Sequence, residues 1–518
     1  MSTAAAAPAP AGRAAWPLIG GLAVVVVAAH ILVALITPYG FHRDEFLYMA
    51  MGRNLRLFAM DFPPLIALLA EAQRAVFGDA LLSLRLAPAL AHGALVSLTG
   101  LLTWRLGGRR YAQAIAMAAV ATGPLFLRAG TLFQPVVFDQ LWWTLALYAL
   151  VRLVAVRDDT RTRRYWILFG LACGLGLLTK FSILLFGAGV LAALLVARRA
   201  WLRTSGPWLA AGLALLIGSP SWLGQIALEF PVLGQMGDLR AAQLDRIGYG
   251  EFLSGLALMH GPAVLLAVTG AATLLRRRWR VVGLAVVVSF LIIMALRGKP
   301  YYVGPVFPTL FAAGAVAADR LVARVHGTAA RYALALGIVA SVGLWGPALL
   351  PLTVPIFPPA ETARFAAAVG AAPTTNRGVA IELPQDFADM LGWEKKVARV
   401  AAVFHALPPR DRDDAVIIAS NYGQAGAIDF YGPRLGLPRA FAPLGSYWFW
   451  GPGDKPGRVI LKVGGAEADL QGYCATVELA ARIDAPWVVP EERDLGIWIC
   501  RDPPGTLQEI WPRFRGQN

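Results

Sequence analysis

Apolar stretches of close to twenty residues alternate with short polar segments from residue 17 to about residue 351. A helix needs ~20 predominantly apolar residues to cross the hydrocarbon core of a bilayer. Because such stretches recur along most of the chain, a single removable signal peptide does not account for them. The pattern predicts about 11 transmembrane helices, near residues 17–37, 84–104, 112–127, 138–156, 165–179, 181–197, 207–223, 258–275, 281–296, 303–323 and 332–350.

The pattern differs on both sides of this region. The low-complexity start, MSTAAAAPAPAGRAA, predicts a disordered N-terminus over residues 1–16. After residue 351, AVIIASNYGQAGAIDFYG is typical of a buried strand, a turn and a helix, and RVILKVGG, ATVELAARI and LGIWICRD predict further strands. We therefore expect a mainly α membrane domain at 17–351 and a small α/β domain at 352–518. Within the first loop, LIALLAEAQRAVF is amphipathic, which favours a place in the membrane interface.

The positive charge gives this bundle an orientation. The formal net charge is +15, and its basic residues gather in alternate loops, as in proteins that keep Lys and Arg on the cytoplasmic side. With eleven spans these loops share one side, so the N-terminus is expected inside and the α/β domain outside the cytoplasm. A nucleic-acid partner is not needed to explain the charge. The loop clusters are Arg105, Arg109 and Arg110; Arg157 to Arg164; Arg198, Arg199 and Arg203; Arg276 to Arg280; and Arg320, Arg324 and Arg331.

Composition agrees with a membrane protein. Hydrophobic residues make up 57% of the chain and charged residues 15%, with a mean hydropathy of +0.57. Such values lie outside ordinary soluble proteins. Cysteine is scarce, and Cys474 and Cys500 both lie in the α/β domain. They form either a disulfide or two buried free thiols, because sequence spacing does not establish the geometry of a disulfide.

Adjacent acids follow the first predicted span, in the stretch FHRDEF at residues 41–46. A carboxylate at a membrane edge can serve as a general base that takes a proton from an attacking hydroxyl. Since neighbouring side chains point in different directions, one of Asp44 and Glu45 can face a reaction while the other braces Arg43. The alternative is a solvated loop with an internal ion pair.

Two further acids sit close to span ends. Asp61 precedes Pro63-Pro64, whose fixed backbone can hold the preceding side chains in place; the alternative is a turn that leads into an interfacial helix. Asp139 lies at the start of an apolar span, where a carboxylate is costly unless it is paired, hydrated or functional. Its alternative is an acid that satisfies free N–H groups at a helix start.

Lys299 lies in the stretch RGKPYYVGPVFP, next to Tyr301 and Tyr302. An ammonium and two phenol hydroxyls suit a phosphate at the membrane surface. The alternative is that the Lys299 side chain extends to the membrane–water interface, among the aromatic residues that gather there. The same two interpretations apply to Lys180, for which the interfacial one is favoured.

Other chemistries lack their motifs. The sequence contains no GxxxxGK[ST] loop, no CxxC pair and no HExxH, and its six His are scattered. We therefore expect no metal or cofactor to be required, although acids near a phosphate could recruit a divalent cation. A transporter or flippase of lipid-linked sugars is the alternative function, but no inverted repeat favours it.

The order of these motifs resembles bacterial family 39 glycosyltransferases, which are relatives of the protein O-mannosyltransferases and lipid A aminoarabinose transferases with the GT-C membrane fold. The stretches that carry the resemblance are Arg43-Asp44-Glu45, Asp61 to Pro64, Asp139, GKPYYVGPVFP, and in the tail LPQDFADMLGWEKKV, SNYGQAGAIDFYGPRLGLP and SYWFWGPG.

This resemblance implies a transferase whose donor is a sugar on a polyprenyl phosphate and whose acceptor is an envelope lipid, glycan or protein, in the bacterial inner membrane. It implies that Asp44, or less directly Glu45, is the base, that Asp139 is a second acid, and that Lys299 with Tyr302 lies near the donor phosphate. Many relatives carry His or Lys where this chain has Phe62, so Arg43 or Arg53 could substitute. The sugar, the acceptor and the oligomeric state are left open.

Overall fold

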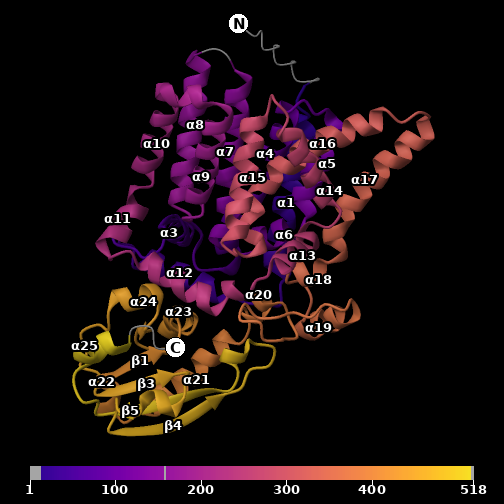
Figure 1. Cartoon of the computed structure of the whole chain (residues 1–518). Helices are drawn as coiled ribbons and strands as arrows, with labels where there is room; N and C mark the ends of the chain where they lie inside the picture. The colour runs from indigo at the N-terminus through magenta and orange to yellow at the C-terminus, as the bar shows by residue number, and fades with distance from the viewer. Residues whose placement is uncertain (1–12, 157–158, 515–518) are drawn as a thin grey trace.

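The computed structural model describes residues 13–156 and 159–514. A long helical bundle stands on a smaller domain that is built around one sheet (Figure 1). The described part begins shortly before α1, where the Ala15 N–H donates to Gln113 Oε1 over 3.0 Å; residues 1–12 of the predicted N-terminal segment lie outside it. The bundle helices are α1 (Trp16–Ile36), α4 (Leu81–Arg105), α5 (Arg110–Thr122), α6 (Pro124–Thr131), α7 (Pro135–Ala155), α8 (Asp159–Leu177), α9 (Ile183–Ala197), α10 (Ser205–Ile217), α11 (Ser219–Ala227), α13 (Tyr249–His260), α14 (Ala263–Leu274), α15 (Arg280–Ala295), α16 (Phe307–Ala323) and α17 (Thr328–Ala348).

The described residues contain 5 helices that are long and apolar enough to cross a membrane, or up to 8 if each bent pair of helices is one span. Two shorter apolar helices, α9 and α15, lie beside them. Each predicted span overlaps one or two helices of the bundle. The positions of the apolar segments are thus confirmed, while the number of crossings stays a prediction.

Glycine and proline break three of the spans that we expected to be continuous, one of them by 57° between α10 and α11. The chain bends by 56° between α5 and α6, where Pro124 begins the second helix, and by 108° between α13 and α14. Gly261 allows the sharper bend, since its φ is 51° and a Cβ there would meet the Trp345 ring at 2.4 Å. Proline begins a helix readily because its missing N–H would be unpaired at that position.

Two short helices, α3 (Leu65–Phe77) and α12 (Pro231–Ala242), lie between the bundle and the sheet domain (Figure 1). A third, α2 (Arg43–Arg53), packs against the sheet domain. The stretch LIALLAEAQRAVF forms α3 over its whole length, as its periodicity predicts. The predicted external loops contact the sheet domain: Thr37 Oγ1 donates to the Pro355 carbonyl, and Lys299 donates to Asn376. These loops therefore share the end of the bundle at which the candidate site lies.

The C-terminal domain contains one five-stranded sheet in the order β2-β1-β3-β5-β4. β1 pairs in parallel with β2 and β3, whereas β5 pairs antiparallel with β3 and β4. The predicted strands and helix are confirmed, and Cys474 and Cys500 form a disulfide across 5.5 Å between their Cα atoms. The strands are β1 (Ala415–Ala419), β2 (Ala440–Phe441), β3 (Val459–Val463), β4 (Thr476–Ile483) and β5 (Leu495–Arg501); the helices around them are α19 (Pro359–Ala368), α20 (Gln385–Ala388), α21 (Trp393–Ala406), α22 (Pro409–Asp414), α23 (Tyr422–Tyr431), α24 (Gly445–Trp450) and α25 (Leu507–Ile510), and α18 (Leu350–Thr353) links them to the bundle.

The sheet domain and α2 share one hydrophobic core. Ile417 of β1 and Leu461 of β3 belong to the same buried cluster as Phe46 and Met49 of α2. The helices α23 and α2 approach closely because Gly426 has no side chain: a Cβ at that position would lie 2.7 Å from the Phe46 Cβ. The sheet domain is therefore joined to the start of the chain by buried apolar contact.

Candidate active site

Asp44 occupies the first turn of α2, where its backbone is fixed by a capping box. His42 Nδ1 accepts from the Asp44 N–H over 3.1 Å, and the His42 N–H donates to Glu45 Oε2 over 2.8 Å. Such reciprocal bonds satisfy N–H groups that a helix start leaves free. The Asp44 side chain remains 24% exposed, so a ligand can reach it.

The two oxygens of Asp44 accept hydrogen bonds from two different domains. Gln134, just before α7, donates to Oδ2 over 2.9 Å. Tyr422, the first residue of α23 in the sheet domain, donates to Oδ1 over 2.8 Å. The carboxylate is therefore oriented by one donor from the bundle and one from the sheet domain.

Glu45 is 0% exposed and serves as an internal brace. It accepts hydrogen bonds from Arg85 Nε and Arg85 Nη2, each over 3.0 Å, and from the Phe133 N–H over 3.0 Å. Together with the His42 N–H, these groups donate hydrogen bonds to both oxygens of the Glu45 carboxylate. Of the two adjacent acids, only Asp44 has a partly exposed side chain.

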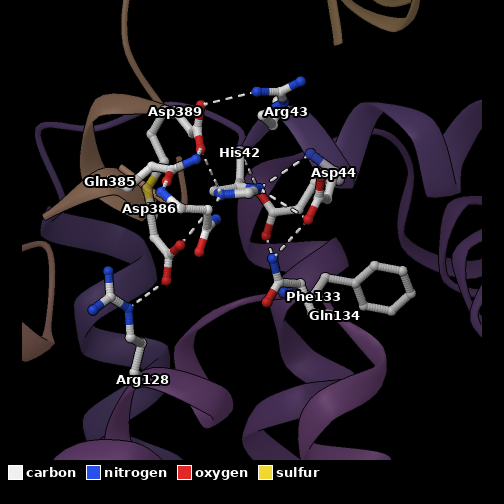
Figure 2. A network of polar contacts seen from close by, with 12 residues as sticks. His42, Arg43, Asp44, Arg128, Phe133, Gln134, Gln385, Asp386 and Asp389 are labelled. Atoms are coloured by element: carbon white, nitrogen blue, oxygen red, sulfur yellow. Dashed lines mark hydrogen bonds and ion pairs between the residues drawn. The ribbon is translucent and has the colours of Figure 1, made fainter. Parts of the chain in front are cut away.

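A segment of the sheet domain closes over the start of α2 (Figure 2). His42 Nε2 lies 3.9 Å from Asp386 Oδ1 and 3.8 Å from Asp389 Oδ2. Arg43 Nη1 lies 3.6 Å from Asp389 Oδ1, and Arg128 pairs with Asp386. The predicted substrate-binding residue Arg43 thus lies in a network of charges that links the two domains.

Lys299 precedes the short helix η3 (Pro300–Val306) and lies at the same end of the bundle. Its Nζ donates to Asn376 Oδ1 over 2.8 Å. It also interacts electrostatically with Asp386 and Asp44. The structure therefore places a cation within the electrostatic reach of the candidate base.

Tyr301 and Tyr302 link Lys299 to a second lysine. Their rings meet edge to face, with centroids 4.7 Å apart. The Nζ of Lys180 lies 4.3 Å from the Tyr302 centroid and 5.4 Å from that of Tyr301. A cation held over aromatic faces is stabilised by the ring quadrupole. Lys180, for which the sequence favours an interfacial role, thus joins the predicted cluster.

Asp139 lies in the first turns of α7 and is 3% exposed. Ser182 Oγ lies 3.0 Å from Asp139 Oδ1 and 2.9 Å from Oδ2. Lys180 interacts with this carboxylate electrostatically. Asp139 therefore lies within electrostatic reach of the lysine that stands over Tyr302, which makes it a candidate for positioning rather than for proton transfer.

Asp61 and Arg53 have other partners. Asp61 Oδ1 accepts a hydrogen bond from Ser446 Oγ over 2.6 Å, and Oδ2 accepts one from Gln235 Nε2 over 3.3 Å. The Asp61 carboxylate therefore connects α12 to the sheet domain. Arg53 lies at the far end of α2, ~14 Å along the helix from Asp44, and donates to the Asp429 carbonyl. Phe62, at which the resemblance predicts a departure from many relatives, packs against the core shared by α2 and the sheet domain.

The charges around the site move several pKa values. Burial raises the pKa of Asp389 to about 6, although Arg43 opposes this shift. Burial lowers the pKa of Lys299 to about 8, and the charge of Asp386 opposes it. Partial burial would raise the pKa of Asp386, but the cations around it, Arg128 first, hold it below its usual value. The site therefore contains both signs of charge around neutral pH.

Several residues of this network have no isolated signal in the sequence. Asp386 and Asp389 belong to LPQDFADM, and Tyr422 belongs to SNYGQAGAIDFYG, stretches in which only the family resemblance points to importance. Within residues 13–156 and 159–514, no three or more His, Cys, Asp or Glu form a group suited to a metal ion. The use of a divalent cation stays a prediction.

Known proteins give two kinds of match. Residues 61–223 match the family model for dolichyl-phosphate-mannose-protein mannosyltransferase. Over 108 residues, 21% of this chain and 19% of the relative, the sequence is 36% identical to the undecaprenyl phosphate-alpha-4-amino-4-deoxy-L-arabinose arabinosyl transferase 1 of Pseudomonas fluorescens. This sequence match therefore spans about a fifth of the curated relative.

The structural matches extend over nearly the whole chain. ArnT from Cupriavidus metallidurans matches in its apo state with a TM-score of 0.59 and 16% identity, and bound to undecaprenyl phosphate with 0.57 and 15%. Each match covers 92% of this chain and 98% of ArnT. The oligosaccharyltransferase of Archaeoglobus fulgidus has a TM-score of 0.50 and 13% identity, over 81% of this chain and 64% of its own. At these identities the matches show that this multi-pass membrane protein has the fold of ArnT, and residues 61–223 are similar to the dolichyl-phosphate-mannose-protein mannosyltransferase family.

Proposed function

We propose that this chain is an integral membrane glycosyltransferase that moves a sugar from a polyprenyl-phosphate donor to a hydroxyl of an envelope acceptor. The observation that carries the proposal is that Asp44 and Lys299 lie at the same end of the bundle, within electrostatic reach of each other. One is a reachable carboxylate held by two donors, the other a lysine coupled to it electrostatically. Base and phosphate-binding cation are the two charges that such a transfer requires.

The related proteins fit this chemistry. One relative is named for an undecaprenyl phosphate-linked aminoarabinose, and the solved ArnT was obtained with undecaprenyl phosphate bound. A lipid-linked donor also suits a site at the end of an apolar bundle, since the lipid tail can stay in the bilayer. We place the site and the sheet domain on the extracytoplasmic side of the bacterial inner membrane, with the N-terminus in the cytoplasm. The acceptor is a lipid, a glycan or a protein.

The proposed reaction is a single displacement with inversion at the anomeric carbon. Asp44 takes the proton of the acceptor hydroxyl, and the acceptor oxygen forms a new bond to the anomeric carbon. The bond from that carbon to the phosphate oxygen breaks, and the polyprenyl phosphate leaves with the electron pair. Lys299 stabilises the negative charge that develops on the leaving phosphate. The step needs no oxidant, and a divalent cation would add to the charge of Lys299 without altering this balance.

The second acid supports the phosphate site in this scheme. Asp139 orients Lys180, whose ammonium stands over the Tyr302 ring. Tyr301 and Tyr302 then offer their hydroxyls to the phosphate beside Lys299. Arg43 lies on the other flank, where it pairs with Asp389. We assign Arg53 and Asp61 to the attachment of the sheet domain instead.

The test is transfer by the purified full chain in lipid vesicles. Undecaprenyl phosphate-mannose and undecaprenyl phosphate-4-amino-4-deoxy-L-arabinose, each with a radiolabelled sugar, serve as donors, and fractionated envelope lipids, glycans and proteins serve as acceptors. Wild type should move label to one acceptor fraction, Asp44→Asn should not, and Asp245→Asn, an exposed acid at the same end, should match wild type. Full turnover in Asp44→Asn together with loss in Glu45→Gln would overturn the base assignment.

The same vesicles distinguish a transporter or flippase of lipid-linked sugars. Such a protein would move the intact labelled donor between leaflets and leave its sugar–phosphate bond unbroken. Leaflet exchange without any release of polyprenyl phosphate would therefore replace the proposed reaction.

A further inference from the structure

Tyr422 stands out because it reaches Asp44 from a different domain. In the proposed mechanism Asp44 must present one lone pair to the acceptor hydroxyl, and a free carboxylate rotates about its last bond. Gln134 fixes one oxygen, over 2.9 Å, from the bundle. Tyr422 fixes the other, over 2.8 Å, from the sheet domain. Both donors are needed to define the plane of the carboxylate.

The position of Tyr422 follows from the sheet. β1 ends at Ala419, and Asn421 caps α23 by accepting the Gln424 N–H over 3.0 Å. The Asn421 amide in turn donates to buried Glu492 over 2.8 Å. Tyr422 is therefore the first helical residue after β1 and the cap residue Asn421, and the hydrogen bond to Glu492 fixes that cap.

Two glycines bring this helix start against α2. A Cβ on Gly423 would lie 3.0 Å from the Arg43 Cβ, and one on Gly426 would lie 2.7 Å from the Phe46 Cβ. Larger residues would separate the helices and lengthen the bond to Asp44. The sequence NYGQAG thus places a phenol and two close-contact positions on one face of α23.

The phenol is also kept in the form that donates. Burial raises the pKa of Tyr422 far above its usual value, and the nearby charge of Asp44 raises it further, against the effect of Arg43. The ring is held from its face by the Arg43 guanidinium, 5.0 Å from the centroid. Tyr422 therefore remains a neutral O–H donor around neutral pH.

We infer that Tyr422 is a positioning residue for Asp44, so that the sheet domain completes the active site of the bundle. This inference rests on the proposed function, in which Asp44 is the base. It assigns the sheet domain a part in the chemical step itself, through one hydrogen bond to the carboxylate.

The experiment compares Tyr422→Phe with Tyr431→Phe, a matched control on the same helix whose ring packs on Phe46 and Phe430. The donor is the undecaprenyl phosphate sugar that wild type uses in the vesicle assay. We expect Tyr422→Phe to lower kcat by ~10–100-fold, because a misdirected catalytic group costs about that much. KM for the donor should stay within ~2-fold, and Tyr431→Phe should match wild type.

The pH profile separates positioning from simple loss of structure. Loss of a donor makes an ionised carboxylate less stable, so the acidic limb of kcat/KM should move ~0.5–1 unit to higher pH in Tyr422→Phe. The other titratable or charged groups that face Asp44 are unchanged in this variant: His42, Arg43, Tyr48, Lys299, Tyr301 and Asp389. In an Asp44→Asn background, Tyr422→Phe should cause no further loss of rate.

A kcat within ~2-fold of wild type with an unmoved acidic limb would overturn the inference while leaving the proposed function intact. A further measurement does not depend on turnover: the infrared band that disappears in Asp44→Asn should shift in Tyr422→Phe and stay in place in Tyr431→Phe. An unshifted band would overturn the inference even if wild type transferred no sugar, whereas inactivity of wild type with every donor would overturn the proposed function alone.

Discussion

Asp44 and Asp139 are both carboxylates at the start of a helix, at the same end of the bundle, yet they are held in different ways. Asp44 depends on Gln134 from the bundle and on Tyr422 from the sheet domain. Asp139 depends on Ser182 and Lys180, which follow α8 within the bundle. The geometry of the first carboxylate therefore requires two domains to dock, while that of the second requires only that neighbouring helices pack.

Exposure separates the two acids as well. The Asp44 side chain is 24% exposed, while Asp139 is 3% exposed and bonded to a serine hydroxyl. A base must reach its substrate, whereas an orienting acid needs only to reach its lysine. The comparison indicates that the role of an acid at a span end depends on which domain supplies the hydrogen-bond donors that orient its carboxylate.

The largest effect is expected from the first acid. Asp44→Asn should lower kcat/KM by ~10³–10⁴, since general base catalysis is worth up to about that factor. Asp139→Asn should lower it by only ~10-fold, because Lys180 would be less well placed but still charged. Transfer of labelled sugar in vesicles measures both, and equal losses would remove the distinction between base and positioning acid.

Removal of the buried brace should affect stability rather than chemistry. Glu45→Ala leaves Arg85 as an unpaired charge, 2% exposed, beneath the site. Loss of one partner of a buried ion pair costs ~3–5 kcal/mol. Thermal unfolding in detergent should show a markedly lower Tm for Glu45→Ala than for Asp44→Asn. If the two variants melt together, Glu45 is not the brace.

Lys299, the proposed phosphate-binding cation, should give an intermediate effect that depends on pH. Lys299 has a pKa of about 8, lowered by burial, so its ammonium is present below that pH and is lost above it. The donor KM should therefore rise above pH ~8. Lys299→Ala should raise the donor KM by ~10–100-fold at pH 7. Lys299→Arg should remove the alkaline rise, because guanidinium stays charged; a KM that is independent of pH in wild type would exclude Lys299 as the phosphate-binding cation.

The smallest effect should come from the partner of the second acid. Ser182→Ala removes the hydroxyl that bonds Asp139, and a single such bond contributes ~1 kcal/mol. We expect a ~2–5-fold loss of kcat/KM, well below that of Tyr422→Phe. Steady-state rates at saturating acceptor measure this loss. An effect of Ser182→Ala as large as that of Tyr422→Phe would show that the bundle is as critical to orientation as the docked domain.

Local pattern was sufficient for much of this architecture. Apolar periodicity located the helices of the bundle, and alternating strands with turn residues located β1, β3, β4 and β5. Those features depend on neighbours in sequence. The breaks at Pro124 and Gly261 show the limit, because the predicted spans 112–127 and 258–275 crossed them. Each break depends on how a helix end packs against other helices.

The site could be predicted only where the residues that indicate its chemistry lie within one short stretch of sequence. Asp44, Asp139 and Lys299 stand out as charges at span ends, and the structure places all three at one end of the bundle. Which of Asp44 and Glu45 faces outward depends on Arg85 and Phe133, which are distant in sequence. Tyr422 and Asp389 contribute through contacts across more than three hundred residues, which no local pattern records.

The close contact between Gly426 and Phe46 has a consequence for synthesis of the protein. The α2 segment leaves the ribosome first, while its partner helix follows 380 residues later, so at ~5–20 residues per second the wait is ~20–80 s. During that interval the apolar face of α2 has no partner from its own sheet domain, and Asp44 lacks its second donor. Under the proposed function, transfer cannot begin until the last third of the chain has been synthesised and has folded against α2. Translation therefore sets the moment at which catalysis begins.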